Sequence, residues 1–106
     1  MNQCKYLHNI INVYVSDCYV KDYPQFLYNL NEELVCKYSL YYGGLQLYQK
    51  DQNHYIVIAV YFDVCGLNEM ISRIENFIER QYEEIFGGFV KRTSILEFSM
   101  AKRVIG

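Results

Sequence analysis

The hydrophobic pattern of the chain switches repeatedly between the period of a strand and that of a helix, and the order of these switches limits which folds it can adopt. Residues 10–15 alternate apolar and polar side chains, as a half-buried strand does. Over residues 26–38 the apolar side chains follow helical spacing instead. Asp22 is suited to cap this helix, and Pro24 to stand in its first turn.

A predicted β-hairpin follows the first helix. Residues 45–48 alternate, residues 50–53 are polar and turn-forming, and residues 55–62 are β-branched or aromatic throughout. A run that is apolar on both faces indicates a central strand. The apolar residues of 67–85 then mark a second amphipathic helix, which Gly87 and Gly88 end, and a last strand is expected over residues 89–100.

The order β-α-β-β-α-β predicts a single domain, residues 1–106, with a ferredoxin-like fold. This is a two-layer α+β sandwich: a four-stranded antiparallel or mixed sheet carries both helices on one face. We expect strands one and three to be central and parallel to each other. The face under the helices is predicted from side-chain parity to comprise Ile11, Val13, Val15, Leu45, Leu47, Ile56, Ile58, Val60, Phe62, Leu96 and Phe98.

The opposite, open face of the sheet is predicted to be rich in tyrosine. The side chains expected to form an interaction surface there are Tyr14, Tyr48, Tyr55, Val57, Tyr61 and Ile95. Apolar aromatic patches usually mark contact surfaces, and tyrosine supplies contact area with few rotors. The prediction is therefore a non-enzymatic protein–protein interaction module, covered most simply by a second copy in a homodimer.

Composition suggests an origin for such a module. The chain is rich in residues with AT-rich codons, including 12 tyrosines, and poor in glycine and proline. An AT-rich gene for a small domain without a catalytic signature fits a viral protein, encoded by a phage or mobile element. Such a protein could inhibit a host or defence complex, as anti-CRISPR proteins do. The net charge of −2 makes nucleic acid or a membrane surface an unfavoured partner.

A single-stranded nucleic-acid binder is the first alternative. RNA-recognition motifs resemble this topology and stack bases on aromatic side chains of their central strands. Residues 53–61 lack the basic residue and the glycine of the corresponding RNA-recognition strand. Protein binding is therefore preferred.

A magnesium-dependent nuclease is the second alternative. Asp17 and Asp63 each follow a predicted central strand, so we expect them to approach one another as Mg²⁺ ligands. CRISPR-associated Cas2 proteins resemble this chain in topology and in an aspartate near the end of strand one. Aspartate is also common in turns and caps, and that interpretation is preferred for both residues.

Cysteine and histidine spacing predicts no metal site or cofactor. Cys4, Cys18, Cys36 and Cys65 form no closely spaced pair of zinc ligands. We expect reduced thiols in a cytoplasmic protein. A cluster of Cys4 with His8 and His54 is conceivable, because both histidines are expected at one end of the sheet, but histidines without a role are the preferred interpretation.

Overall fold

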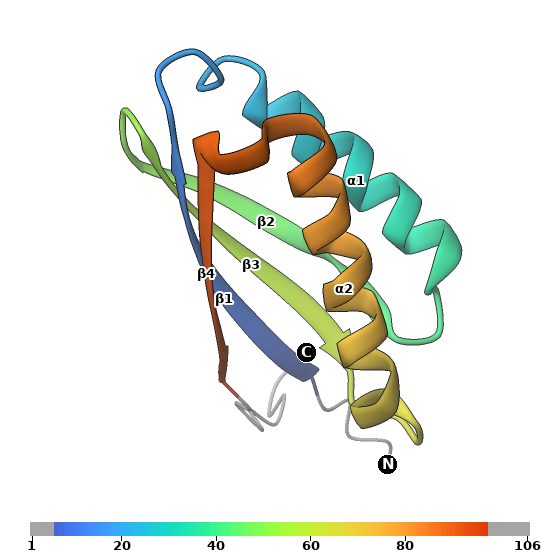
Figure 1. Cartoon of the computed structure of the whole chain (residues 1–106). Helices are drawn as coiled ribbons and strands as arrows, with labels where there is room; N and C mark the ends of the chain where they lie inside the picture. The colour runs from blue at the N-terminus through green and yellow to red at the C-terminus, as the bar shows by residue number, and fades with distance from the viewer. Residues whose placement is uncertain (1–5, 98–106) are drawn as a thin grey trace.

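The computed structural model describes residues 6–97, with side chains up to Thr93, and shows a four-stranded sheet with both helices on one face (Figure 1). The strand order is β2-β3-β1-β4, so the predicted ferredoxin-like sandwich is confirmed. The elements are β1 (Tyr6–Val15), α1 (Tyr23–Lys37), β2 (Tyr42–Asp51), β3 (His54–Phe62), α2 (Leu67–Phe86), a short 3₁₀ turn (Gly87–Phe89) and β4 (Val90–Glu97).

All three neighbouring strand pairs are antiparallel. Tyr6 of β1 lies opposite Phe62 of β3, and Tyr14 lies opposite His54. The expectation that these central strands are parallel was wrong. The crossover through α1 makes β1 parallel to β2, and the hairpin then turns β3 back against β2, so β3 must run against β1. The end of β1 therefore lies beside the start of β3.

Strand β1 alternates strictly between the two faces of the sheet. Its buried side chains are Leu7, Asn9, Ile11, Val13 and Val15. The helix-facing side of this strand was thus predicted correctly over residues 11–15. The helix-facing side of β1 extends toward the N-terminus as far as Leu7, and it includes one fully buried polar residue, Asn9.

Strand β3 faces the opposite way from the prediction. The side chains buried beneath the helices are Tyr55, Val57, Ala59 and Tyr61. The half-buried side chains on the open face are His54, Ile56, Ile58, Val60 and Phe62. A strand that is apolar on both faces gives no parity signal, and a shift of one residue exchanges every side chain between the faces.

Strand β2 follows the predicted parity but begins earlier. Leu45 and Leu47 pack against the core, while Tyr48 is 50% exposed. Tyr42 belongs to the strand and is buried, and the pairing with β3 shifts register between Tyr42 and Leu45. The predicted core residues of the last strand, Leu96 and Phe98, lie outside the described side chains, as does Ile95.

The helices cover the sheet with apolar side chains at helical spacing. Those of α1 are Tyr23, Leu27, Leu30 and Leu34, and those of α2 are Leu67, Ile71, Ile74, Phe77, Ile78, Tyr82 and Phe86. Asp22 is the N-cap of α1 as predicted, although its side chain makes no capping hydrogen bond. Within residues 6–97, no helix is long and apolar enough to cross a membrane.

The irregular start of β2 depends on the backbone of Gly44. Its φ is +107°, in a region that L side chains rarely adopt, and a Cβ there would meet no heavy atom within 4 Å. Gly44→Ala should therefore cost only the backbone strain, about 1–2 kcal/mol of unfolding free energy in urea denaturation. Gly88→Ala is the control, because that site is equally open and has no positive φ. Equal losses in the two variants would contradict this assignment.

Candidate ligand site between the sheet and the helices

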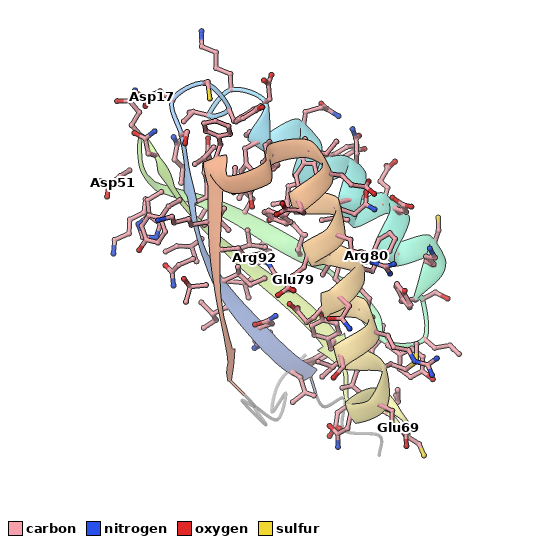
Figure 2. All side chains as sticks on the ribbon, in the orientation of Figure 1. Asp17, Asp51, Glu69, Glu79, Arg80 and Arg92 are labelled. Atoms are coloured by element: carbon pink, nitrogen blue, oxygen red, sulfur yellow. The ribbon has the colours of Figure 1, made fainter. Side chains whose placement is uncertain are left out.

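A buried ion pair joins the two layers of the sandwich. Arg92 projects from β4 toward α2 (Figure 2), and its Nη2 lies 2.8 Å from Oε2 of Glu75 on α2. The side chains are 8% and 17% exposed, respectively. Charges removed from water are costly unless they are paired and hydrogen-bonded, so each group depends on the other.

Glu75 is held from the sheet as well. The side-chain amide Nδ2 of Asn9 on β1 donates a hydrogen bond to Glu75 Oε1 at 2.9 Å. The Tyr61 hydroxyl on β3 lies 3.5 Å from the same oxygen. The carboxylate therefore has partners on three strands, which fixes its position beneath α2.

Arg92 keeps unused hydrogen-bonding capacity. Its Nε and Nη2 are buried, and among the described residues neither makes a hydrogen bond of good geometry. Nη2 is ion-paired with Glu75, and a hydrogen-bonding interaction with Arg92 acts to lower the pKa of the Tyr82 phenol. The guanidinium carbon lies 5.5 Å from the centre of the Tyr82 ring, a cation–π contact. A buried donor left unsatisfied costs about 1–3 kcal/mol, so this guanidinium is suited to receive an oxygen atom from elsewhere.

Two tyrosines lie side by side near this guanidinium. The hydroxyl oxygens of Tyr23 on α1 and Tyr82 on α2 are 2.6 Å apart. Burial raises the pKa of both phenols well above the ordinary value, although the charge of Arg92 acts in the opposite direction on each. Both hydroxyls therefore stay protonated at neutral pH and act as neutral hydrogen-bonding groups.

An apolar groove opens between α1 and β2. Its volume is about 230 Å³, and its lining residues are Pro24, Leu27, Tyr28, Asn31, Leu45 and Leu47. Leu27 and Leu45 also line an inner gap that reaches Tyr82 and Arg92. The inner gap holds about 10 Å³, which is about the space one water molecule needs.

A hydrogen bond between Tyr42 and Asn31 lies where the groove adjoins the inner gap. Tyr42, which lines the gap, donates from its hydroxyl to Oδ1 of Asn31, which lines the groove, at 2.7 Å. A ligand entering from the groove reaches the guanidinium only if side chains at this junction move. The arrangement is an apolar groove with polar side chains in a separate small gap behind it, and small-molecule sites combine apolar walls with a few such polar groups.

The structure divides the predicted tyrosine surface between the two faces of the sheet. Tyr14 and Tyr48 are about half exposed, as expected, and Tyr14 stacks on His54 with ring centres 4.4 Å apart. The predicted exposure of Tyr55, Val57 and Tyr61 was wrong, because all three are buried beneath the helices. Tyr61 instead belongs to the surroundings of Glu75.

The residues considered for metal binding are not brought together. Because β1 and β3 are antiparallel, Asp17 follows the end of β1 and Asp63 follows the opposite end of the sheet. Asp17 accepts a hydrogen bond from Asn53 Nδ2 at 2.7 Å, which fits the preferred role in a turn. Within residues 6–97, no group of three or more His, Cys, Asp or Glu side chains could hold a metal ion.

The histidines were also expected together and are separated. His8 lies opposite Val60, near one end of the central strands, whereas His54 lies opposite Tyr14 at the other end. Cys4 lies outside the described residues. The proposed association of His8 with His54 was therefore wrong, for the same reason as that of the aspartates.

The polar groups of the site were missed in the sequence, although two of them left a signal. Arg92 shares its parity on β4 with the buried Val90, so an arginine interrupts the apolar side of a strand. Glu75 directly follows the buried Ile74 and precedes Phe77 and Ile78. Asn9 gave no such signal in the sequence, because it precedes the predicted start of the first strand.

Comparison with known proteins identifies a shared fold. No family model matches the chain, and no curated protein matches its sequence. The chain is similar to a solved structure from Nitrosomonas europaea, whose name assigns it provisionally to the antibiotic biosynthesis monooxygenases. The TM-score is 0.67, the sequence identity is 8%, and the match covers 94% of this chain and 95% of that one. At this identity the likeness establishes the fold.

These findings correct the predicted function. The inhibitor hypothesis depended on a continuous tyrosine surface, and three of its members lie in the core. The solved structure with the same fold carries the name of an enzyme, not that of a viral inhibitor or a protein-binding module. The expectation of a non-enzymatic viral inhibitor was therefore wrong.

Proposed function

We propose that the chain binds a small, largely apolar molecule carrying an acidic oxygen, and that it acts on this molecule as an oxygenase. The observation that carries the proposal is the buried guanidinium of Arg92, which is paired with Glu75 and lines the small gap behind the apolar groove; its Nε has no hydrogen-bond partner among the described residues. Arginine stays protonated in proteins, so it favours the anionic form of a carboxyl, enol or phenol group.

The surroundings of Arg92 suit this chemistry. Glu75 is already held by Asn9, so it fixes the guanidinium from one side. The inner gap is walled mainly by aliphatic side chains, which exclude water and strengthen electrostatic contacts with a bound oxyanion. The anion of a phenol or enol is more electron-rich than its neutral form and is more readily oxidised by O₂.

Two further observations support the proposal. The neighbour of the same fold is named as a monooxygenase, and a reaction of that class suits an electron-rich aromatic substrate. The described cysteines, Cys18, Cys36 and Cys65, are exposed free thiols. Free thiols are typical of a reducing compartment, so we propose that the protein works in the cytoplasm.

Binding of three naphthalenes of similar size tests the proposal. We expect 1-naphthoate and 1-naphthol to bind and neutral 1-methylnaphthalene to bind at least about tenfold more weakly, which corresponds to one hydrogen bond to a charged group. Arg92→Met should remove this preference, whereas Arg80→Met, at an exposed position on α2, should leave it intact. Calorimetric titration measures all three ligands.

Turnover is tested separately by oxygen uptake. Monooxygenation of 1-naphthol with O₂ yields 1,4-naphthoquinone and water, so the substrate itself supplies the electrons and hydrogens. Naphthol-dependent oxygen uptake that Arg92→Met abolishes would support an enzyme. Failure of all three naphthalenes to bind, or equal binding of the acidic and neutral compounds, would overturn the proposal.

A further inference from the structure

A cleft between α2 and β4 reaches Arg92 from the other edge of the sheet. Its volume is about 230 Å³, and its lining residues are Glu79, Tyr82, Glu83, Gly87, Val90 and Arg92. The edge strands are β2 and β4, so this cleft and the groove between α1 and β2 open at opposite edges. Arg92 lines both the cleft and the inner gap, so a ligand in the cleft meets the guanidinium without displacing the side chains between the groove and the gap.

The mouth of the cleft is negatively charged. Glu79 and Glu83 are exposed and stand one turn apart on α2, a spacing at which like charges destabilise a helix. Glu83 begins the last turn, at the negative end of the helix dipole, and that turn holds no basic residue. Among the side chains that the structure describes, no lysine or arginine is ion-paired with either carboxylate. A cation at the mouth would relieve each of these unfavourable interactions.

The inner end of the cleft carries a buried hydrogen-bond donor. The side chain of Arg92 is only 8% exposed, and its Nε makes no hydrogen bond to another described residue. Arg92 is ion-paired with Glu75, which leaves the two carboxylates at the mouth without an internal counter-ion. In Figure 2, Arg92 and Glu79 lie between β4 and α2. The cleft therefore offers a donor for an oxygen atom at its inner end and two carboxylates at its mouth.

The wall between these two ends is apolar. Tyr82 and Val90 are buried, and the Tyr82 ring already contacts the guanidinium. Gly87 has no side chain, and a Cβ built on it meets no heavy atom within 4 Å, so this side of the cleft is open. A single aromatic ring with a short alkyl chain suits such a space, because its apolar surface is removed from water beside Tyr82 and Val90.

We propose that the ligand of this site carries a protonated amine in addition to its acidic oxygen, and that it binds in the cleft with the oxygen at Arg92 and the ammonium at Glu79 and Glu83. The chemical class is an arylalkylamine with a phenol or carboxyl group. An ammonium group has three donors, which is enough for both carboxylates. The acidic oxygen rests on the proposed function, and the amine is the addition made here.

Calorimetric titration of the full chain at low salt tests this proposal with three probes of one shape. Tyramine carries both groups, 4-ethylphenol lacks the amine, and phenethylamine lacks the hydroxyl. We expect tyramine to bind most tightly and each of the others to bind about tenfold more weakly, through loss of two exposed ion pairs or of one hydrogen bond to a charged group. Added salt should weaken tyramine and leave 4-ethylphenol unchanged.

Variants of the mouth locate the ammonium. Glu79→Gln with Glu83→Gln should reduce tyramine affinity about tenfold, each single variant about threefold, and none should affect 4-ethylphenol. Glu84→Gln is the matched control, because Glu84 is exposed on the same helix outside the cleft lining, and it should bind tyramine normally. Removing like charges from the end of a helix does not destabilise it, so the double variant is expected to fold.

The outcomes separate this proposal from the proposed function. Absence of tyramine binding, equal binding of tyramine and 4-ethylphenol, or unchanged tyramine affinity in the folded double variant would overturn the ammonium site. If the oxygen assignment alone is wrong, tyramine and phenethylamine bind equally and Arg92→Met has no effect, whereas the double variant still weakens both amines.

Discussion

Glu75→Gln should lower the free energy of unfolding by about 3–5 kcal/mol, because it leaves the Arg92 guanidinium charged, buried and unpaired. Glutamine has nearly the shape of glutamate, so the loss reports charge rather than volume. Urea unfolding followed by circular dichroism measures it. Glu84→Gln, at an exposed position on the same helix, should change stability by less than about 0.5 kcal/mol.

The double variant Glu75→Met with Arg92→Met should lose less stability than a variant that removes only one of the two charges. Removing both charges together eliminates the unpaired group, so the double variant should be more stable than Glu75→Gln alone. In a double-mutant cycle with the single methionine variants, the coupling should be at least about 2 kcal/mol. If the losses simply add, the two side chains do not depend on each other and the assignment of the ion pair is wrong.

The architecture could be predicted because it depends on the spacing of apolar side chains along the chain. Helices α1 and α2 and the alternating strand β1 each carry one strong repeat, and their order alone selects the fold. The relative direction of β1 and β3 follows from the same order, through one crossover and one hairpin. The mistaken parallel pairing had two consequences: it brought Asp17 toward Asp63, and His8 toward His54.

The residues of β3 alone could not predict which of its two faces is buried beneath the helices. Tyr55 and Tyr61 were assigned to the open face by side-chain parity, yet their rings fill the core and their hydroxyls find internal partners. Ile56 and Ile58 then occupy the open face. The site around Arg92 depends on tertiary contacts between β4, β1 and α2, and a single residue type at a single position does not reveal such contacts.

Buried tyrosines should make the domain unstable in alkali. Burial raises the pKa of Tyr23, Tyr42, Tyr61 and Tyr82 above the ordinary value of about 10. Above that pH the unfolded chain releases these protons while the folded chain keeps them, so the free energy of unfolding falls as pH rises. Each phenol lowers the free energy of unfolding by about 1.4 kcal/mol per pH unit, and the four together lower it by about 5.6 kcal/mol per pH unit.

The stability of a typical domain is about 5–15 kcal/mol, so at this loss per pH unit cooperative unfolding is expected within about one to three pH units above 10. The tyrosinate absorbance of these four phenols should appear in the same transition as the loss of the circular dichroism signal. Tyr23→Phe should reduce the slope of unfolding free energy against pH by about a quarter, because one of four protons no longer contributes. Tyr48→Phe, at an exposed position, should leave the slope unchanged. Full ionisation of all tyrosines without loss of the circular dichroism signal would show that these phenols are not held neutral by burial, and the neutral Tyr23–Tyr82 pair beside Arg92 would then have no basis.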